Sequence, residues 1–178
     1  MQDTEIIHEV LQGNQHAFKK LVEKYTDALF RTATGFVHNR EDAEEIVQES
    51  FLRAYQSLAA FNGKSAFSTW LYRITVNHSI NYIRANKRKR FWSSLSQTFV
   101  SRSSDATPDV RMEQQEQRIL IREAMETLPQ KQRIAFVLSK YEELSQKQIA
   151  EVLNVTEGAV EQLIQRAKIN LRKKIKKT

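Results

Sequence analysis

The sequence predicts an all-α protein built of two helical domains with a flexible linker between them. The chain of 178 residues contains only four glycines and two prolines. Its apolar residues recur at spacings of three and four rather than two, and one serine-rich segment interrupts this period. Because each amphipathic helix buries one apolar stripe against its neighbours, the chain is expected to form two helical bundles.

The first domain is expected to span residues 1–90 and to contain four helices, of which the first three carry plain apolar stripes. Gly13 and Asn14 end the short first helix, and Asn39 and Arg40 separate the second from the third. At this spacing the apolar residues of each helix fall on one side. The three stripes are Ile6, Ile7, Val10 and Leu11, then Phe18, Leu21, Val22, Tyr25, Leu29, Ala33 and Phe36, then Ala43, Ile46, Val47, Phe51, Ala54, Tyr55 and Leu58.

The fourth helix follows a polar and aromatic loop at residues 61–67 and has two unlike faces. One face is apolar and is expected in the core, with Tyr72, Val76, Ile80 and Ile83. The other face carries Trp70, Asn77, Asn81, Arg84 and Arg88. The tryptophan ring can stack on a base, the asparagine amides can donate and accept hydrogen bonds, and the arginines can neutralise phosphates. Loop and face together suit unpaired nucleic-acid bases. A solvated polar face with a basic end, favoured by the helix dipole, explains the helix alone equally well.

The helical period disappears over residues 91–112, which are expected to form the linker. Six serines and Pro108 lie between Phe91 and Val110, and such a composition is typical of connecting segments. Several apolar residues are unusual in a free tether, so parts of the linker are expected to dock on another surface. These residues are Phe91, Trp92, Leu95, Phe99 and Val100.

The second domain is expected to span residues 113–178 and to end in a helix-turn-helix. Ser145 and Gln148 have the spacing of a capping box. Asn154 begins a tight turn, and Thr156 can cap the final helix. On the side of the final helix opposite its apolar face lie Gly158, Glu161, Gln162, Gln165 and Ile169, and Arg166 and Lys168 flank them. Such units present a polar helix to the major groove, although a helical hairpin used only for packing is the alternative.

The chain has a formal net charge of +7, and its charged residues are unevenly distributed along the sequence. Residues 1–60 hold ten acidic and six basic residues, 61–112 hold two and nine, and 113–178 hold nine and thirteen. This asymmetry indicates a protein that meets a polyanion with one surface and a different partner, such as a basic protein patch, with another.

No pattern in the sequence indicates an enzyme, a metal site or a cofactor. There are no cysteines, the four histidines stand apart, and no glycine-rich phosphate loop or nucleophile elbow occurs. The carboxylates between Glu41 and Glu49 are more simply a solvated or partner-facing strip than a cation site. Since it lacks a signal peptide and any run long enough to span a bilayer, the chain is expected in the cytoplasm, with no membrane contact by itself.

Three stretches together resemble the extracytoplasmic-function group of bacterial sigma factors in the sigma-70 family. They are DAEEIVQESFLRAY at Asp42–Tyr55, FNGKSAFSTWLYRITVNHSINYIR at Phe61–Arg84 and LPQKQRIAFVLSKYEELSQKQIAEVLNVTEGAVEQLIQRAK at Leu128–Lys168. The resemblance implies a region-two domain, a linker and a region-four domain. It also implies an alternative sigma factor that binds core RNA polymerase, at the β′ clamp helices and the β flap, and directs initiation at specific promoters. An anti-sigma factor is a further implied partner.

The resemblance assigns residues to three surfaces. Core polymerase would be bound by Asp42, Glu45, Ile46, Gln48, Glu49, Phe51 and Arg53. The minus-ten element, including one flipped base, would be bound by Phe61, Asn62, Lys64, Ser65, Phe67, Trp70, Arg73, Asn77, Asn81, Arg84 and Arg88. The minus-thirty-five element would be bound by Thr156, Glu157, Gly158, Glu161, Gln162, Gln165, Arg166 and Lys168. Glu161 and Leu163 depart from the family pattern, because many relatives carry arginine there.

Two other functions are compatible with parts of this pattern. A free-standing helix-turn-helix regulator would bind duplex DNA without polymerase, but it would have no use for a loop that holds a base. A helical adaptor would bind only protein, with its basic strips as solvated faces. Purification with core polymerase and a run-off transcription assay separate the three functions.

Overall fold

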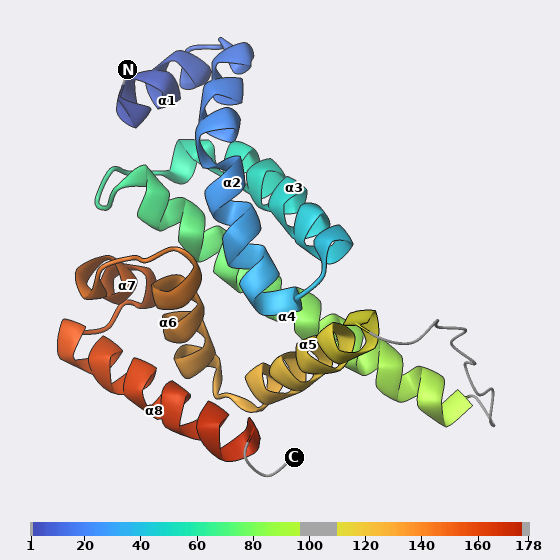
Figure 1. Cartoon of the computed structure of the whole chain (residues 1–178). Helices are drawn as coiled ribbons and strands as arrows, with labels where there is room; N and C mark the ends of the chain where they lie inside the picture. The colour runs from blue at the N-terminus through green and yellow to red at the C-terminus, as the bar shows by residue number, and fades with distance from the viewer. Residues whose placement is uncertain (1, 97–109, 176–178) are drawn as a thin grey trace.

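The computed structural model describes residues 2–96 and 110–175, and its regular structure over these ranges is entirely helical (Figure 1). The all-α prediction is therefore confirmed. Two single 3-10 turns, at Gln15–Ala17 and Leu58–Ala60, accompany the α-helices. The α-helices are α1 Asp3–Leu11, α2 Phe18–Val37, α3 Arg40–Gln56, α4 Phe67–Ser96, α5 Val110–Thr127, α6 Gln130–Tyr141, α7 Gln146–Leu153 and α8 Glu157–Ile175.

In the first domain α2, α3 and α4 pack against one another in pairs, and α1 covers the N-terminal end of α2. The predicted stripes form its core, in which Leu21, Leu29, Ile46, Leu58 and Leu71 are at most 1% exposed. Leu11 of the first stripe is an exception, since it lies at the end of α1 and is 52% exposed. The apolar face predicted for α4 is also buried. A polar contact fixes α1, since Asp3 accepts hydrogen bonds from Lys24 and Tyr25 of α2.

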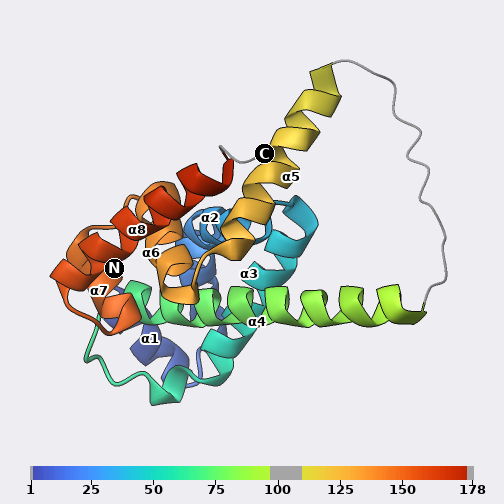
Figure 2. The same cartoon turned by 90° about the horizontal axis from the view of Figure 1, so that it is seen from below.

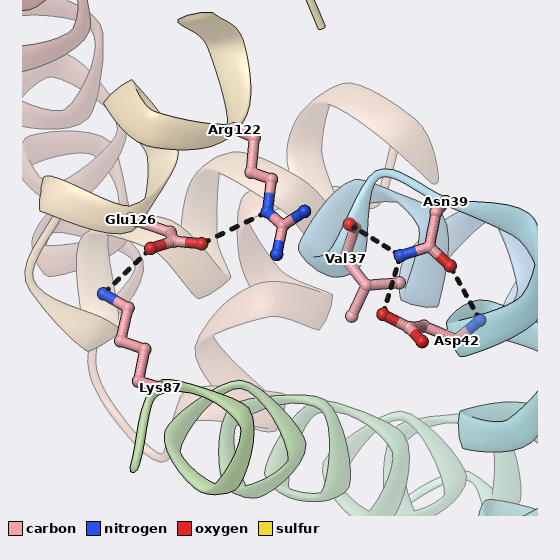
Figure 3. Close-up of polar contacts among 6 residues, drawn as sticks. All are labelled: Val37, Asn39, Asp42, Lys87, Arg122 and Glu126. Carbon is pink, nitrogen blue, oxygen red and sulfur yellow. Dashed lines mark hydrogen bonds and ion pairs between the residues drawn. The ribbon is translucent and has the colours of Figure 1, made fainter. Parts of the chain in front are cut away.

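The break between α2 and α3 has a local cause. His38 ends α2 in the left-handed conformation, with φ at 59°. The Asn39 side chain then accepts a hydrogen bond from the Asp42 backbone N–H at 2.8 Å, and its amide donates to the Asp42 carboxylate at 2.6 Å (Figure 3). Because an N-cap satisfies a backbone donor that has no partner within the helix, Asn39 determines where α3 begins.

In the second domain α5, α6 and α7 surround the inner face of α8. The predicted helix-turn-helix is present as α7 and α8. Ser145 and Gln148 form the predicted capping box, and Asn154 adopts the left-handed conformation with φ at 51°. Thr156 caps α8 by accepting a hydrogen bond from the Ala159 backbone N–H at 3.3 Å. The core of the pair includes Ile149, Val160 and Ala167, all fully buried.

The linker predicted at residues 91–112 needs a correction at both ends. Helix α4 continues to Ser96, and α5 already begins at Val110. The remaining positions of the predicted linker, 97–109, lie outside the described residues. An uninterrupted run of residues without glycine or proline lets α4 extend beyond the last residue of the apolar stripe, and it projects past the other helices in Figure 2.

The two domains are packed together. Helix α6 contacts α2 and α7 contacts α4, whereas α8 lies on the far side of α6 and α7 from the first domain (Figures 1 and 2). Among the described helices, none is long and apolar enough to cross a membrane. This packing decides which of the predicted binding residues remain exposed.

Candidate polymerase and promoter interfaces

The outer face of α3 is acidic and carries most of the predicted polymerase contacts. Glu45 and Gln48 are exposed, and Glu49 accepts a hydrogen bond from Arg53 at 2.8 Å. Asp42 is held by the N-cap of the helix. These residues form one polar strip, which we call the α3 strip: Asp42, Glu45, Gln48, Glu49 and Arg53.

Two residues predicted for polymerase binding do not belong to this strip. Ile46 is completely buried, and Phe51 is only 6% exposed and packs edge-on against Phe18 with ring centroids 6.4 Å apart. Both side chains point into the bundle because they share the apolar side of α3. They support the helix, and a partner docked on this surface does not reach them.

The loop before α4 is anchored by an aromatic cluster. The rings of Phe61, Phe67 and Trp70 have centroids 5.4 to 5.7 Å apart. Phe67 is 3% exposed, so its predicted contact with DNA is corrected to a core position. Phe61 and Trp70 are half-buried, which leaves part of each ring accessible to a stacked base.

The polar part of the loop faces outward. Gly63 adopts a positive φ of 70°, a conformation that glycine enters at little cost. Asn62 and Lys64 are exposed, and the Asn62 side chain accepts a hydrogen bond from the Lys64 backbone N–H at 3.2 Å. Ser65 is half-buried beside them. The loop therefore presents an amide, a cation and a hydroxyl next to two partly accessible rings.

Along α4 the predicted contact residues Asn77, Asn81, Arg84 and Arg88 are all exposed, although Arg84 also donates a hydrogen bond to the second domain. An open hollow of about 400 Å³ lies beside Asn77 and Asn81, and a second of about 550 Å³ lies between Asn81 and Arg88. These residues form the α4 strip, and they offer amide and guanidinium groups at helical spacing.

Two arginines predicted to bind the minus-ten element, Arg73 and Arg84, contact the second domain. Arg73 donates two hydrogen bonds to the backbone carbonyl of Glu151 in α7. Arg84 donates to the side-chain oxygen of Gln130 at 2.5 Å. Neighbouring Lys87 forms an ion pair with Glu126 of α5 at 3.1 Å (Figure 3). In this arrangement part of the positive charge of α4 is therefore held by the chain itself.

The outer face of α8 is exposed and polar, as predicted. Its members are Thr156, Glu157, Gly158, Glu161, Gln162, Gln165, Arg166 and Lys168, all exposed. Leu163 is half-buried and packs on the hydrophobic core. Leu163 therefore contributes to folding. Of the two residues that differ from the family pattern, Glu161 is the one that changes the chemistry of the exposed face.

Two histidines of the first domain, His38 and His78, have lowered pKa values. Among the described residues, no group of three or more histidine or acidic side chains could hold a metal ion. Burial lowers the pKa of His38 to about 4, aided by the nearby charges of Arg122 and Arg133. Burial also lowers the pKa of His78. Both histidines are thus kept neutral by the fold.

The chain matches the sigma-70 region 2 family over residues 21–89 and the sigma-70 region 4 family over residues 118–171. The ECF RNA polymerase sigma-E factor of Haemophilus influenzae is 32% identical over 97% of this chain and 95% of its own. SigW, an ECF RNA polymerase sigma factor of Bacillus subtilis, is 32% identical over 96% and 95%. The chain belongs to the extracytoplasmic-function sigma factors. Sigma factors are transcription initiation factors that bind core RNA polymerase and direct it to promoters, and that is the function of this chain.

Solved structures share the fold of this sigma factor. CnrH in complex with the cytosolic domain of CnrY aligns with a TM-score of 0.69 and 24% identity, covering 98% of this chain and 97% of that one. RpoE in complex with the anti-sigma factor NepR from Bartonella quintana aligns with a TM-score of 0.59 and 21% identity, covering 89% and 96%. Because both domains of the sigma factor are present in one chain, the interpretations as a free-standing regulator and as an adaptor are set aside.

Proposed function

We propose that this sigma factor meets its partners through three separate surfaces, namely the α3 strip, the loop at residues 61–66 with the α4 strip, and the outer face of α8. One observation supports all three assignments. The polar residues assigned to these surfaces are exposed or half-buried, whereas most apolar residues of α3, α4 and α8 are buried. Leu52 of α3 and Ile169 of α8 are large apolar residues that stay exposed beside them. Folding therefore leaves these polar groups available for another molecule.

The α3 strip is proposed to bind the clamp helices of the polymerase β′ subunit. Its carboxylates, of which Glu45 is exposed and Asp42 and Glu49 are half-buried, complement a basic partner. Electrostatic complementarity accelerates and orients docking. The Tyr82 hydroxyl of α4 donates its hydrogen bond to Asp42 at 2.7 Å and also lies 3.2 Å from the Glu45 carboxylate. It thereby helps to position these two carboxylates of the strip. The second domain is proposed to bind the β flap.

The loop and the α4 strip are proposed to hold the melted minus-ten element. Half-accessible Phe61 and Trp70 offer surfaces on which a flipped base can stack. Asn77 offers a donor and an acceptor further along α4, at a separate hollow that Arg53 and Asn81 also line. Base–aromatic stacking is worth about 1–3 kcal/mol per base, comparable to the few kcal/mol that unstacking costs. Arg88 is placed to neutralise a phosphate.

The outer face of α8 is proposed to bind the minus-thirty-five element in the major groove. Gln162, Gln165 and Arg166 have the groups that contact base edges. Arg172, Lys173 and Lys174 in the last turn supply positive charge for phosphates. The base-contacting residues and the basic last turn both remain accessible while the domains are packed, because this face of α8 points away from the first domain.

Three further points complete the proposal. The factor acts in the cytoplasm, where core polymerase lies, and it catalyses no reaction of its own. An anti-sigma factor is proposed as a regulatory partner, and the similarity in fold to sigma factors solved in complex with CnrY and NepR supports this.

A run-off transcription assay with core polymerase and a pool of genomic fragments tests the function. We expect discrete transcripts that are absent with core polymerase alone. If no fragment supports initiation above the level of core polymerase, the proposal is wrong.

A further inference from the structure

A hollow lies at the junction of the two domains, beside the C-terminal end of α2. We call it the His38 hollow, and its volume of about 440 Å³ is in the range of small-molecule sites. Four helices contribute to it. Its walls are formed by Phe30, Thr34 and His38 of α2, Arg40 of α3, Ile121 of α5 and Tyr141 of α6.

The walls of the His38 hollow suit a flat apolar group. Phe30 and Tyr141 are half-buried rings, and Ile121 is 46% exposed. The Arg40 guanidinium lies over Phe30 at the rim, 6.0 Å from the ring centroid. A flat apolar group placed among these side chains would remove their surfaces from water, which is favourable.

Polar atoms that lack a partner lie in and next to the hollow. Among the described residues, no hydrogen bond reaches the Thr34 hydroxyl, Nε2 of His38 or Nε of Arg133, and all three atoms are buried. Buried polar groups are usually hydrogen-bonded, so these three atoms indicate a missing partner. Thr34 and His38 line the hollow. Because neither atom has a hydrogen bond to lose, turning it toward a ligand costs only a side-chain rotation.

The packing of the domains brings arginines to this place. Helices α2 and α6 pack antiparallel (Figure 1), and both oxygens of Glu142, which follows α6, accept hydrogen bonds from Arg31 of α2 at 3.0 Å each. The start of α6, with Arg133, therefore lies beside the C-terminal end of α2. Burial lowers the pKa of His38, and the charges of Arg122 and Arg133 lower it further. Arg133 does not line the hollow, so it acts through its charge.

The carboxylates near the His38 ring already have partners. Glu126, which opposes the lowering of that pKa, forms ion pairs with Arg122 at 3.3 Å and with Lys87 at 3.1 Å (Figure 3). Asp42 shares a narrow neighbouring hollow with Arg122, and its carboxylate accepts hydrogen bonds from two side chains of the first domain. An anionic ligand at the His38 hollow would therefore meet guanidinium groups rather than unpaired carboxylates.

From these observations we propose that the His38 hollow binds a small molecule that combines a flat apolar body with a carboxylate. The body lies against the apolar walls. The carboxylate accepts hydrogen bonds from the Thr34 hydroxyl and from His38 in the tautomer that carries its proton on Nε2. None of the lining residues belongs to the three surfaces proposed for polymerase and DNA, so this site is additional to them.

Titration of the full chain with phenylacetate tests the site, and phenylacetamide and acetate are the matched probes. We expect phenylacetate to bind with a Kd of about 1 mM or lower, and each of the other two to bind at least about tenfold more weakly. The amide keeps the ring without the charge, whereas acetate keeps the charge without the ring. Equal binding of acetate would indicate an adventitious ion only, and equal binding of the amide would remove the carboxylate from the site. Either result, or no binding of phenylacetate, would overturn the proposal.

A substitution on the apolar wall locates the ligand. Ile121→Glu places a carboxylate on that wall, and we expect it to weaken phenylacetate binding about tenfold or more. Ile119→Glu is the matched control, because Ile119 is 49% exposed on the same helix and does not line the hollow. Since both isoleucines are exposed, neither substitution disturbs the core. Equal phenylacetate binding by the two variants would overturn the site.

Thr34→Val tests the polar contact. The substitution keeps the shape of the side chain and removes a hydroxyl that has no hydrogen-bond partner among the described residues. We therefore expect thermal stability to be kept, while phenylacetate binds about fivefold more weakly. Binding as tight as in wild type would show that this hydroxyl does not hold the carboxylate, and would contradict the proposed geometry.

The ring of His38 provides a direct readout by NMR. The charged groups that face it are Arg122 and Glu126 of α5, Arg133 of α6 and Arg40 at the rim. A bound carboxylate stabilises the imidazolium, so saturating phenylacetate should raise the pKa of His38 toward its ordinary value. An unchanged pKa of this ring at saturation would place the carboxylate elsewhere and would overturn the proposal.

Discussion

Tyr82 of α4 donates a hydrogen bond to the carboxylate of Asp42 in α3 at 2.7 Å. Burial and this bond raise the pKa of Tyr82 to about 12, so the hydroxyl remains a donor at neutral pH. The helix proposed to bind polymerase and the helix proposed to hold the minus-ten strand are thereby connected through one polar contact. Docking on α3 consequently places α4 in a defined orientation toward the DNA.

Reversing the charges of Glu45 and Glu49 to lysine should weaken binding to core polymerase by about tenfold at physiological salt, because electrostatic complementarity is lost. The Glu49 reversal also repels Arg53, its present partner at 2.8 Å. Gel filtration or fluorescence titration with core enzyme measures the effect. Glu23→Lys with Glu123→Lys introduces the same charge at other exposed positions and should bind normally. Equal binding by both double variants would remove the α3 strip from the interface.

Asn77→Ala should impair promoter opening more than closed-complex formation, because the exposed amide is proposed to contact an extruded base rather than the duplex. Permanganate footprinting of the minus-ten region reports melting, and a premelted bubble template should rescue part of the defect. Asn14→Ala, at another exposed asparagine, serves as control. Normal melting by the Asn77 variant would contradict the assigned role.

The exposed carboxylate of Glu161 should make α8 selective by repelling phosphate, because among base edges in the major groove it can accept a hydrogen bond only from the amino group of cytosine or adenine. Glu161→Arg is therefore expected to raise affinity for unrelated duplex and to steepen its salt dependence by about one unit of slope. Glu123→Arg controls for net charge. Binding of the full chain to a duplex library at several salt concentrations measures both.

Loss of a base contact in α8 should weaken binding to the preferred upstream sequence, unlike the Glu161→Arg substitution, which is expected to raise binding to unrelated duplex. Gln162→Ala or Arg166→Ala should cost roughly 1–3 kcal/mol on the preferred upstream sequence and relax selectivity there. Arg166→Ala additionally removes a charge, so Gln162→Ala is the cleaner test. An unaltered sequence preference in Glu161→Arg and in both alanine variants would mean that α8 does not recognise DNA through these positions.

His38 should make the packed structure sensitive to acid. Its pKa is lowered from about 6.5 to about 4, mainly by burial and then by Arg122 and Arg133, whereas Glu126 opposes the shift. The neutral ring is favoured in the folded state, so its full contribution is present above pH 6.5 and is lost as the pH falls toward 4. The loss should reach about 2 kcal/mol, allowing for partial exposure.

Urea unfolding between pH 4 and 8 measures this loss. His38→Asn should flatten the curve in that window, and asparagine tolerates the left-handed conformation at this position. His16→Asn, at an exposed histidine, is the control for the loss of an imidazole. Parallel curves for wild type and His38→Asn would show that this ring does not control the response.

The helix limits could be predicted well because their causes are local. Asn39, Ser145 and Thr156 each satisfy backbone groups within three residues of themselves, and such caps are visible in a short stretch of sequence. The exposed faces of α3, α4 and α8 followed from the helical period in the same way. The linker was less predictable, because continuation of α4 and the early start of α5 have no comparable stop signal.

The sequence by itself determined the all-α fold, the helix caps, the family and the polar face of α8, since all of these depend on neighbours along the chain or on extended motifs. Periodicity already placed Ile46 and Phe51 on the apolar stripe of α3, against the polymerase contact that the resemblance gave them. Only the tertiary structure decided that Phe67 is interior, because a residue of the predicted loop has no helical period to place it. It alone joined Arg31 to Glu142. These residues are separated by 111 positions, and nothing local to either side chain specifies a partner that only packing brings within reach.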